Sequence, residues 1–133
     1  MSQENVELAR QAYEAWNRGE LEWLLEHMTD DFEFIPGLGF ADIDTVIRGK
    51  EGWRRFAETW RDAWEDITVS VERIEDRGDR IAALLTFQGI GRESGVTVSV
   101  RVGHVATVTE GCVSKLVSIS GWDETLEAVG LSE

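Results

Sequence analysis

The apolar side chains of this chain repeat with a helical period in the first half and with a period of two in the second half. In the first half, residues such as Ala9, Tyr13 and Trp16 recur every three or four positions, which is typical of amphipathic helices. From Ile67 onward, apolar residues alternate with polar ones, as in a strand with one solvated face. This change of period predicts an α+β domain whose helices pack on one face of an antiparallel sheet.

Turn-forming residues divide the two halves into elements, and we expect residues 1–133 to form one domain. The expected helices cover residues 2–16, 20–28, 50–66 and 124–129. The expected strands cover residues 32–35, 67–72, 80–88, 96–109 and 112–120, and residues 37–49 are expected to form a loop.

The composition excludes several classes of partner. With 26 acidic and 13 basic side chains, the formal charge is −13, which argues against nucleic acids and anionic membranes because both attract cations. No apolar run approaches the roughly 20 residues that span a bilayer, and the first residues do not resemble a signal peptide. Cys112 is the only cysteine, so we expect a cytoplasmic protein without disulfides. The scattered histidines predict no metal site, and the lack of a glycine-rich phosphate loop predicts no nucleotide cofactor.

Four segments resemble the SnoaL-like branch of the nuclear-transport-factor-2-like superfamily. They are ARQAYEAWNRGELE at residues 9–22, TDDFEF at 29–34, RGKEG at 48–52 and LEAVGL at 126–131. The resemblance implies a cone-shaped roll, in which three N-terminal helices pack on a strongly curved, mixed, mostly antiparallel sheet and leave a pocket between them. Members of the superfamily include ketosteroid isomerases, polyketide cyclases, limonene-epoxide hydrolases, dehydratases and non-catalytic modules. The fold alone therefore does not determine which activity, if any, the chain has.

The catalytic positions of two of these enzymes can be carried over onto the chain. The resemblance places the isomerase's oxyanion tyrosine at Ala12, its general-base aspartate at Ile35 or Pro36, and its protonated aspartate at Gly103. Because all three positions lack the required group, steroid isomerase chemistry is not expected. In the epoxide hydrolase pattern, Arg101 matches the arginine, but Gly103 replaces the aspartate.

Strand alternation sorts the residues of the long strand around Gly103 into two faces. If Gly103 faces the pocket, as the resemblance implies, Arg101 faces it as well. Val100, Val102 and His104 then face away, on a side that is almost wholly apolar. The resemblance implies a homodimer that packs through the outer sheet face, and an apolar face is expected of such an interface, so we predict this homodimer with His104 as an interface histidine.

Arg101 is the candidate catalytic residue and the expected polar anchor of the pocket. A guanidinium among apolar neighbours is costly unless it is paired or faces water or an anion. It could hold a carboxylate or enolate oxygen, or it could pair at the rim with Glu33, Asp42 or Asp123. No general base is assigned, and Glu33, Asp42 or Asp44 would have to enter from the loop after the first strand.

The other candidate ligand-binding residues are aromatic side chains and two serines. They are Trp16, Phe34, Phe56, Trp60, Phe87, Ser118, Ser120 and Trp122, in addition to Arg101. The alternative for the helical aromatic residues is ordinary core packing. No histidine or lysine lies at a sequence spacing that would activate either serine as a nucleophile.

These observations lead to two main hypotheses from different classes. The first is a cofactor-free protein with a small-molecule pocket which, if catalytic, moves a proton next to a carbonyl in a cyclase, isomerase or dehydratase step. Its ligand would be a small apolar or aromatic molecule that could carry an anionic group for Arg101. The second is a non-catalytic dimeric ligand-binding or interaction module, favoured by the vacancies at Ala12, Pro36 and Gly103. An epoxide hydrolase is the third, weaker alternative.

Overall fold

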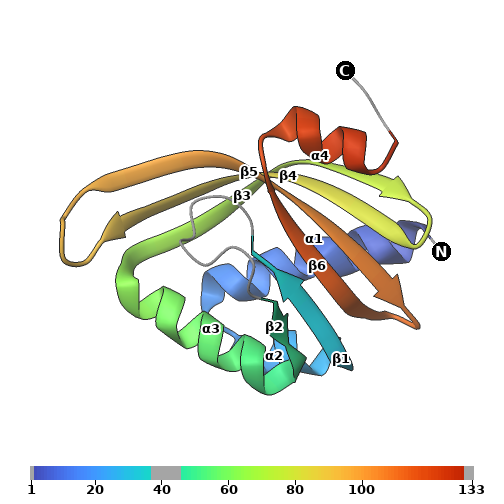
Figure 1. Ribbon diagram of the computed structural model, residues 1–133, viewed down its shortest axis with the longest axis horizontal. Coiled ribbons are helices and arrows are strands. Elements are labelled where there is room, and N and C mark those ends of the chain that lie inside the picture. The colour runs from blue at the N-terminus through green and yellow to red at the C-terminus, as the bar shows by residue number, and fades with distance from the viewer. Residues whose placement is uncertain (1, 37–45, 131–133) are drawn as a thin grey trace.

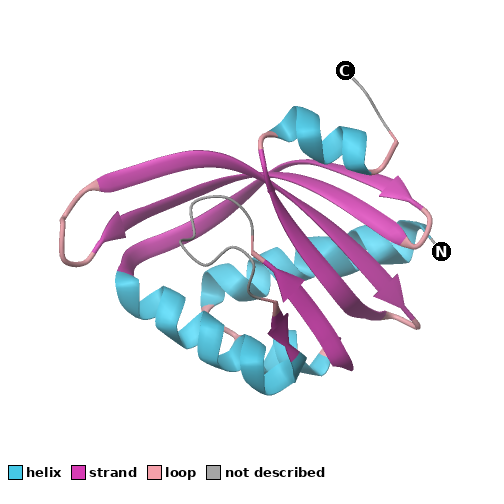
Figure 2. Cartoon of the chain, viewed as in Figure 1, coloured by secondary structure: helices cyan, strands magenta, loops and turns pink. Residues whose placement is uncertain are grey.

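A computed structural model describes residues 2–36 and 46–130, and it arranges helices on both faces of a curved sheet (Figure 1). The helices are α1 (Ser2–Arg18), α2 (Leu21–Glu26), α3 (Gly49–Ala63) and α4 (Trp122–Ala128). The strands are β1 (Met28–Ile35), β2 (Ile47–Arg48), β3 (Trp64–Arg77), β4 (Arg80–Gly91), β5 (Thr97–Thr109) and β6 (Cys112–Ser120). Figure 2 shows the helices of the first half and the long strands of the second.

The strands form one mixed sheet in the order β2-β1-β6-β5-β4-β3. Strands β1 and β6 are parallel, and every other neighbouring pair is antiparallel. Helices α1 and α3 pack against one face, and α4 packs against β4, β5 and β6 on the other. The predicted α+β fold, with three N-terminal helices on a curved and mostly antiparallel sheet, is confirmed. None of the helices in the described ranges is long and apolar enough to cross a membrane.

Several boundaries differ from the sequence-based expectation, among them the start of β1 at Met28 and the start of β3. Strand β3 begins at Trp64, so this side chain belongs to the sheet and not to the preceding helix. The pairing register of β3 with β4 shifts between Glu65 and Thr68, and Asp66 has a φ of 53°. Such a bulge breaks the period of two locally, which is why alternation alone placed the start of the strand too late. The short strand β2 falls within the segment expected to be a loop.

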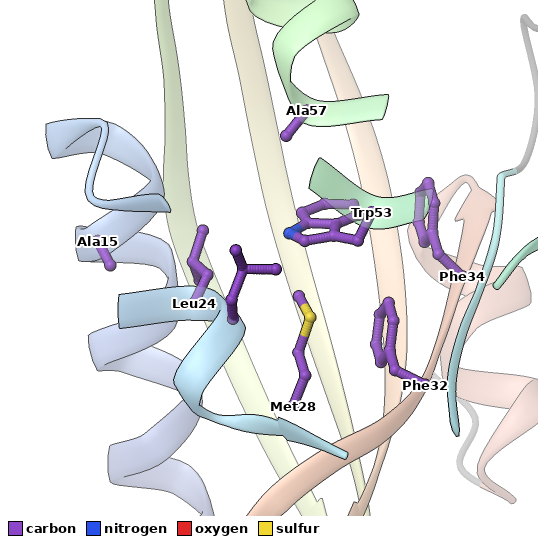
Figure 3. Close-up of a cluster of buried hydrophobic side chains, with 8 residues drawn as sticks. Ala15, Leu24, Met28, Phe32, Phe34, Trp53 and Ala57 are labelled. Carbon is purple, nitrogen blue, oxygen red and sulfur yellow. The ribbon is translucent and has the colours of Figure 1, made fainter. Parts of the chain in front are cut away.

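A cluster of buried apolar side chains joins the first three helices to β1 (Figure 3). Trp53 of α3 is 7% exposed and lies at its centre, with the rings of Phe32 and Phe34 edge-on at centroid distances of 6.1 and 5.4 Å. Ala15 and Ala57 are the small members of the cluster and are almost fully buried. The cluster therefore holds α1, α2 and α3 together at the β1 side of the sheet.

The end of α1 is attached to the free edge of the sheet by the side-chain amide of Asn17. Its Nδ2 donates to the carbonyl oxygen of Val69 at 2.9 Å, and the Val69 N–H donates to its Oδ1 at 2.8 Å. Because β3 is the last strand of the sheet, these bonds satisfy backbone groups that would otherwise be unpaired. Nearby, Arg61 of α3 donates to the carbonyl oxygen of Trp16 at 2.9 Å. The Asn17 bonds therefore hold α1 on β3, and the Arg61 bond holds α3 against the end of α1.

Gly103 faces α4 on the opposite side of the sheet from the first three helices. A Cβ atom at this position would lie 1.8 Å from Oγ1 of Thr125, which is fully buried. Val105, two residues further along the same face, packs with Ala82 and Val129. The expectation that Gly103 faces the pocket is therefore wrong, because α4 requires a residue without a side chain at this point.

We predict that Gly103→Ala lowers the free energy of unfolding by about 1–3 kcal/mol, because the added methyl group displaces Thr125 and the start of α4. Urea denaturation followed by circular dichroism measures the change. Ser99→Ala is the matched control, since Ser99 is an exposed residue of the same strand, and its effect should stay within about 0.5 kcal/mol. Equal midpoints for Gly103→Ala and the wild type would contradict the close packing of α4 on β5.

Candidate functional site

The inner face of the sheet and the first three helices line a cavity of about 470 Å³. Pockets for small organic ligands have volumes of roughly 300–1,000 Å³. Most of the lining is aliphatic or aromatic, and no carboxylate among the described residues belongs to it. Its aromatic members are Tyr13, Trp16, Trp23, Phe32, Phe34, Trp53, Phe56, Trp60, Trp64 and Phe87. The cavity is therefore suited to an uncharged, apolar molecule.

Helix α3 presents a ladder of aromatic rings along one side of the cavity. Trp53, Phe56 and Trp60 follow at spacings of three and four residues, which places them on one helix face. Phe56 is stacked on Trp53 at a centroid distance of 5.4 Å and on Trp60 at 5.9 Å. Phe87 of β4 continues the ladder, 5.7 Å from Trp60. Such a wall offers flat ring faces to a flat ligand.

A hydrogen bond between two polar side chains joins α1 to the sheet across the cavity wall. The hydroxyl oxygen of Tyr13 lies 2.8 Å from Nδ1 of His104, and both residues line the cavity. His104 pairs with Ala83 of β4 on one side and with Ser118 of β6 on the other. Because directly paired residues share a face of the sheet, Ser118 lies beside His104 on the cavity side. These three residues form a polar group in an otherwise apolar part of the wall.

Burial sets the protonation states of the Tyr13–His104 pair. It lowers the pKa of His104 to about 4 and raises the pKa of Tyr13. At neutral pH the pair is therefore an uncharged imidazole and an uncharged phenol, which together carry one N–H and one O–H hydrogen. The bond between them uses one of these two hydrogens. Whichever tautomer forms, one donor is left over for another partner.

The pairing of β4 with β5 overturns the predicted orientation of β5. Val102 pairs with Leu85 and Val100 pairs with Phe87, and all four residues line the cavity together with His104. The prediction that Val100, Val102 and His104 lie on the outer face is therefore wrong. It was inferred from the position of Gly103, and an error of one residue in a strand exchanges its two faces. Association of two copies stays a prediction, but these three side chains do not form the outer face.

Arg101 and Trp122 contact each other at the margin of the site. The guanidinium carbon of Arg101 lies 4.6 Å from the centre of the Trp122 ring, and the side chain of Arg101 is exposed. The indole N–H of Trp122 donates to the carbonyl oxygen of Leu85 at 3.2 Å. Arg101 touches the edge of the cavity, whereas Trp122 is absent from the lining formed by the described residues. The expectation that Trp122 lines the pocket is wrong, because it begins α4 on the other face of the sheet.

The predicted general bases do not enter the described part of the cavity. Glu33 forms an ion pair with Arg48, its partner on the neighbouring strand β2. Its chain neighbours Phe32 and Phe34 line the cavity, so alternation turns Glu33 away from it. Asp42 and Asp44 lie outside the described residues. Among residues 2–36 and 46–130, no group of three histidine, cysteine or acidic side chains could hold a metal ion.

Eight of the nine predicted ligand-binding residues line the cavity: Trp16, Phe34, Phe56, Trp60, Phe87, Ser118, Ser120 and, at its edge, Arg101. Sequence reasoning missed Tyr13, His27 and His104, which also line it. For His104, the sequence signal that could have indicated the cavity was the apolar character of the strand face that carries it. A strand face that is almost wholly valine and alanine is as typical of a cavity wall as of a subunit interface.

Comparison with known proteins identifies relatives of this fold. The SnoaL-like domain family matches residues 9–116. An NTF2-like protein of unknown function from Burkholderia pseudomallei superposes with a TM-score of 0.81 at 18% identity, covering 98% of this chain and 99% of that one. A protein from Jannaschia with the provisional designation of SnoaL-like polyketide cyclase gives 0.79 at 20% identity, covering 89% and 85%.

A third relative was solved with a small molecule. TerC, co-crystallised with polyporic acid, gives a TM-score of 0.78 at 18% identity and covers 95% of this chain and 98% of TerC. At these identities the solved structures show a shared fold. A search of curated protein sequences gave no significant match.

We predict that the wild type loses stability as the pH falls from about 6.5, the ordinary pKa of histidine, to about 4, the lowered pKa of His104. In this window the unfolded chain takes up a proton that the folded chain excludes, which costs on the order of 2–3 kcal/mol at the lower end. His104→Gln removes the titrating group, so its free energy of unfolding should fall less over the same window. Urea denaturation at several pH values measures both slopes, and identical slopes would contradict the burial of a neutral His104.

Proposed function

The chain belongs to the SnoaL-like domain family, and on this premise we propose that it binds a small, flat, apolar carbonyl compound and moves a proton next to that carbonyl without a cofactor. The observation that carries the proposal is the Tyr13–His104 hydrogen bond in the wall of an apolar cavity. Polyketide-cyclase-like relatives of the same fold are consistent with such a ligand.

The cavity supports a ligand that is flat and uncharged at its reacting end. The stacked rings of Phe56 and Trp60 provide a flat, apolar surface. A carboxylate in contact with this wall would lose its hydration with no cation beside it, since Arg101 lies at the margin and is exposed. A ketone oxygen needs only one donor, and the Tyr13–His104 pair has one to spare.

The pair can both give and accept a proton when His104 carries its hydrogen on Nδ1. In that tautomer Nδ1–H donates to the Tyr13 oxygen, the Tyr13 O–H points to the ligand, and Nε2 has a free lone pair. Nε2 takes the proton from the carbon next to the carbonyl, and the electron pair of that C–H bond forms the C=C bond of an enol. Tyr13 gives its proton to the carbonyl oxygen and receives the Nδ1 proton of His104.

The step leaves the pair uncharged, with its hydrogens rearranged. His104 now carries its hydrogen on Nε2, and the Tyr13 O–H donates to Nδ1. Because no imidazolium accumulates, the burial that lowers the pKa of His104 does not oppose the shift. The reverse step returns the proton to the same carbon or to the far end of a conjugated system. Transfer of this kind is the common element of enolisation, isomerisation and aldol-type cyclisation.

A non-catalytic ligand-binding module is the second candidate function. It is favoured by the lack of a carboxylate among the described residues of the lining, because carboxylates are common general bases for carbon acids. In that case the Tyr13–His104 pair would bind a ligand oxygen without transferring a proton. The two functions differ in whether a bound ketone exchanges its hydrogens.

We predict that the wild type accelerates exchange of the α-hydrogens of β-tetralone with D₂O, followed by proton NMR. Tyr13→Phe and His104→Phe should each lower the accelerated rate by a factor on the order of 10², because each removes one half of the proton transfer. Ser99→Ala serves as the matched control, since Ser99 is exposed and faces away from the pair.

Two results would decide against the proton transfer. Bound β-tetralone that exchanges no faster than in buffer would favour the non-catalytic module. An exchange rate that falls in Arg101→Met and is unchanged in Tyr13→Phe would indicate that Arg101, and not the Tyr13–His104 pair, binds the carbonyl oxygen.

A further inference from the structure

His27 faces the same cavity at a distance from the Tyr13–His104 pair, and the proposed proton transfer does not use it. It follows the last residue of α2, and its carbonyl oxygen accepts a hydrogen bond from the Val113 N–H at 2.8 Å. Val113 pairs with Val108 of β5, four residues beyond His104. At about 3.3 Å per strand residue, the level of the sheet at which His27 lies is about 13 Å along β5 from that of His104.

The contacts of His27 determine which of its ring nitrogens carries the hydrogen. Nδ1 lies 2.8 Å from the carbonyl oxygen of Trp23, and a carbonyl can only accept, so Nδ1 is the N–H donor. In the neutral ring Nε2 then has a free lone pair and is an acceptor. No described residue donates to Nε2, although the imidazole belongs to the cavity lining.

The orientation of the His27 ring is held by its neighbour in the helix. Trp23 lies four residues earlier, and the two rings are stacked with centroids 3.8 Å apart and an angle of 17° between their planes. The hydrogen bond to the Trp23 carbonyl fixes the same ring from its edge. A ring held on its face and at Nδ1 presents its acceptor in one direction, which is the arrangement that binding sites require.

We propose that His27 is a second binding site of the cavity, which accepts a hydrogen bond from a hydroxyl group of the ligand. The proposal rests on the proposed function and names its substrate class, an elongated flat hydroxy-ketone. The Tyr13–His104 pair offers a donor to the ketone oxygen, and His27 offers an acceptor to a hydroxyl at the far end. Because a lone pair repels another lone pair, a second carbonyl or a carboxylate is disfavoured at His27.

The length of the ligand follows from the separation of the two sites. Two or three linked or fused aromatic rings span about the offset of roughly 13 Å along the strands that separates the levels of His27 and His104. The aromatic side chains of the wall provide the stacking surface for such a frame. The cavity is thus expected to distinguish the two ends of a ligand by their opposite hydrogen-bonding character.

Three probes with the same rigid frame test this proposal by isothermal titration calorimetry. They are para-acetyl-para′-hydroxybiphenyl, its methyl ether, which lacks the hydroxyl donor, and its para-ethyl analogue, which lacks the ketone. The wild type should bind the hydroxy-ketone about tenfold more tightly than the methyl ether, as expected for one hydrogen bond. His27→Phe keeps an aromatic ring beside Trp23 and should make the two affinities equal.

Tyr13→Phe supplies the comparison at the other end of the cavity. It should weaken binding of the hydroxy-ketone and of the methyl ether alike, because both keep the ketone, and it should leave the ratio of their affinities unchanged. The wild-type ratio tests the proposal even if His27→Phe does not fold. Equal wild-type affinities for the hydroxy-ketone and its methyl ether would overturn the assignment of His27.

The two proposals fail in different ways in this experiment. A ketone-dependent affinity with no preference for the hydroxyl overturns the role of His27 and leaves the proposed function intact. Wild-type binding that does not depend on the ketone, or no binding of any probe, overturns the proposed function and this inference with it. A tenfold preference that is lost in His27→Phe and kept in Tyr13→Phe supports the second site.

Discussion

The register between β4 and β5 determines what lies inside this protein. Leu85 is paired with Val102 and Ala83 with His104, and these pairs place His104 on the same face as the aromatic wall. A shift by one residue would turn His104 towards α4 and bring Arg101 into the cavity. Such a shift is opposed by Gly103, because α4 leaves no space for a side chain at that point on its face. Strand β5 therefore determines both which side chains line the cavity and how closely α4 packs on the other face of the sheet.

The cavity combines a large apolar surface with few polar groups, and this composition gives those groups their importance. A buried hydroxyl or imidazole without a partner costs free energy, so Tyr13 and His104 are stable there because they bond to each other. A neutral imidazole and a phenol together carry two polar hydrogens, and the hydrogen bond between them uses only one of the two. One donor therefore remains in either tautomer, the Tyr13 O–H when Nδ1 of His104 carries the hydrogen and Nε2–H when it does not, so the pair can always bind a ligand oxygen.

The sequence predicted the order of the elements, the fold class and most of the aromatic wall, because these depend on local periodicity. Trp16, Phe56 and Trp60 lie on helix faces that any packing of the three helices would turn inward. The orientation of β5 could not be obtained in this way, since a period of two fits either face of a sheet equally well. Tyr13 and His104 are 91 residues apart, and no local pattern relates them. Ser118 was expected in the pocket, but its neighbour His104 follows only from the pairing of β5 with β6.

The proposed proton transfer requires that His104 is a neutral imidazole bonded to Tyr13 inside the cavity. Nitrogen-15 NMR of the histidine side chains tests it directly, because the shifts of Nδ1 and Nε2 report protonation, tautomer and hydrogen bonding at once. We expect a neutral His104 ring at pH 6, well above its lowered pKa of about 4, with an Nδ1 shift that changes in Tyr13→Phe. An imidazolium at pH 6, or ring shifts that are the same with and without the Tyr13 hydroxyl, would contradict it.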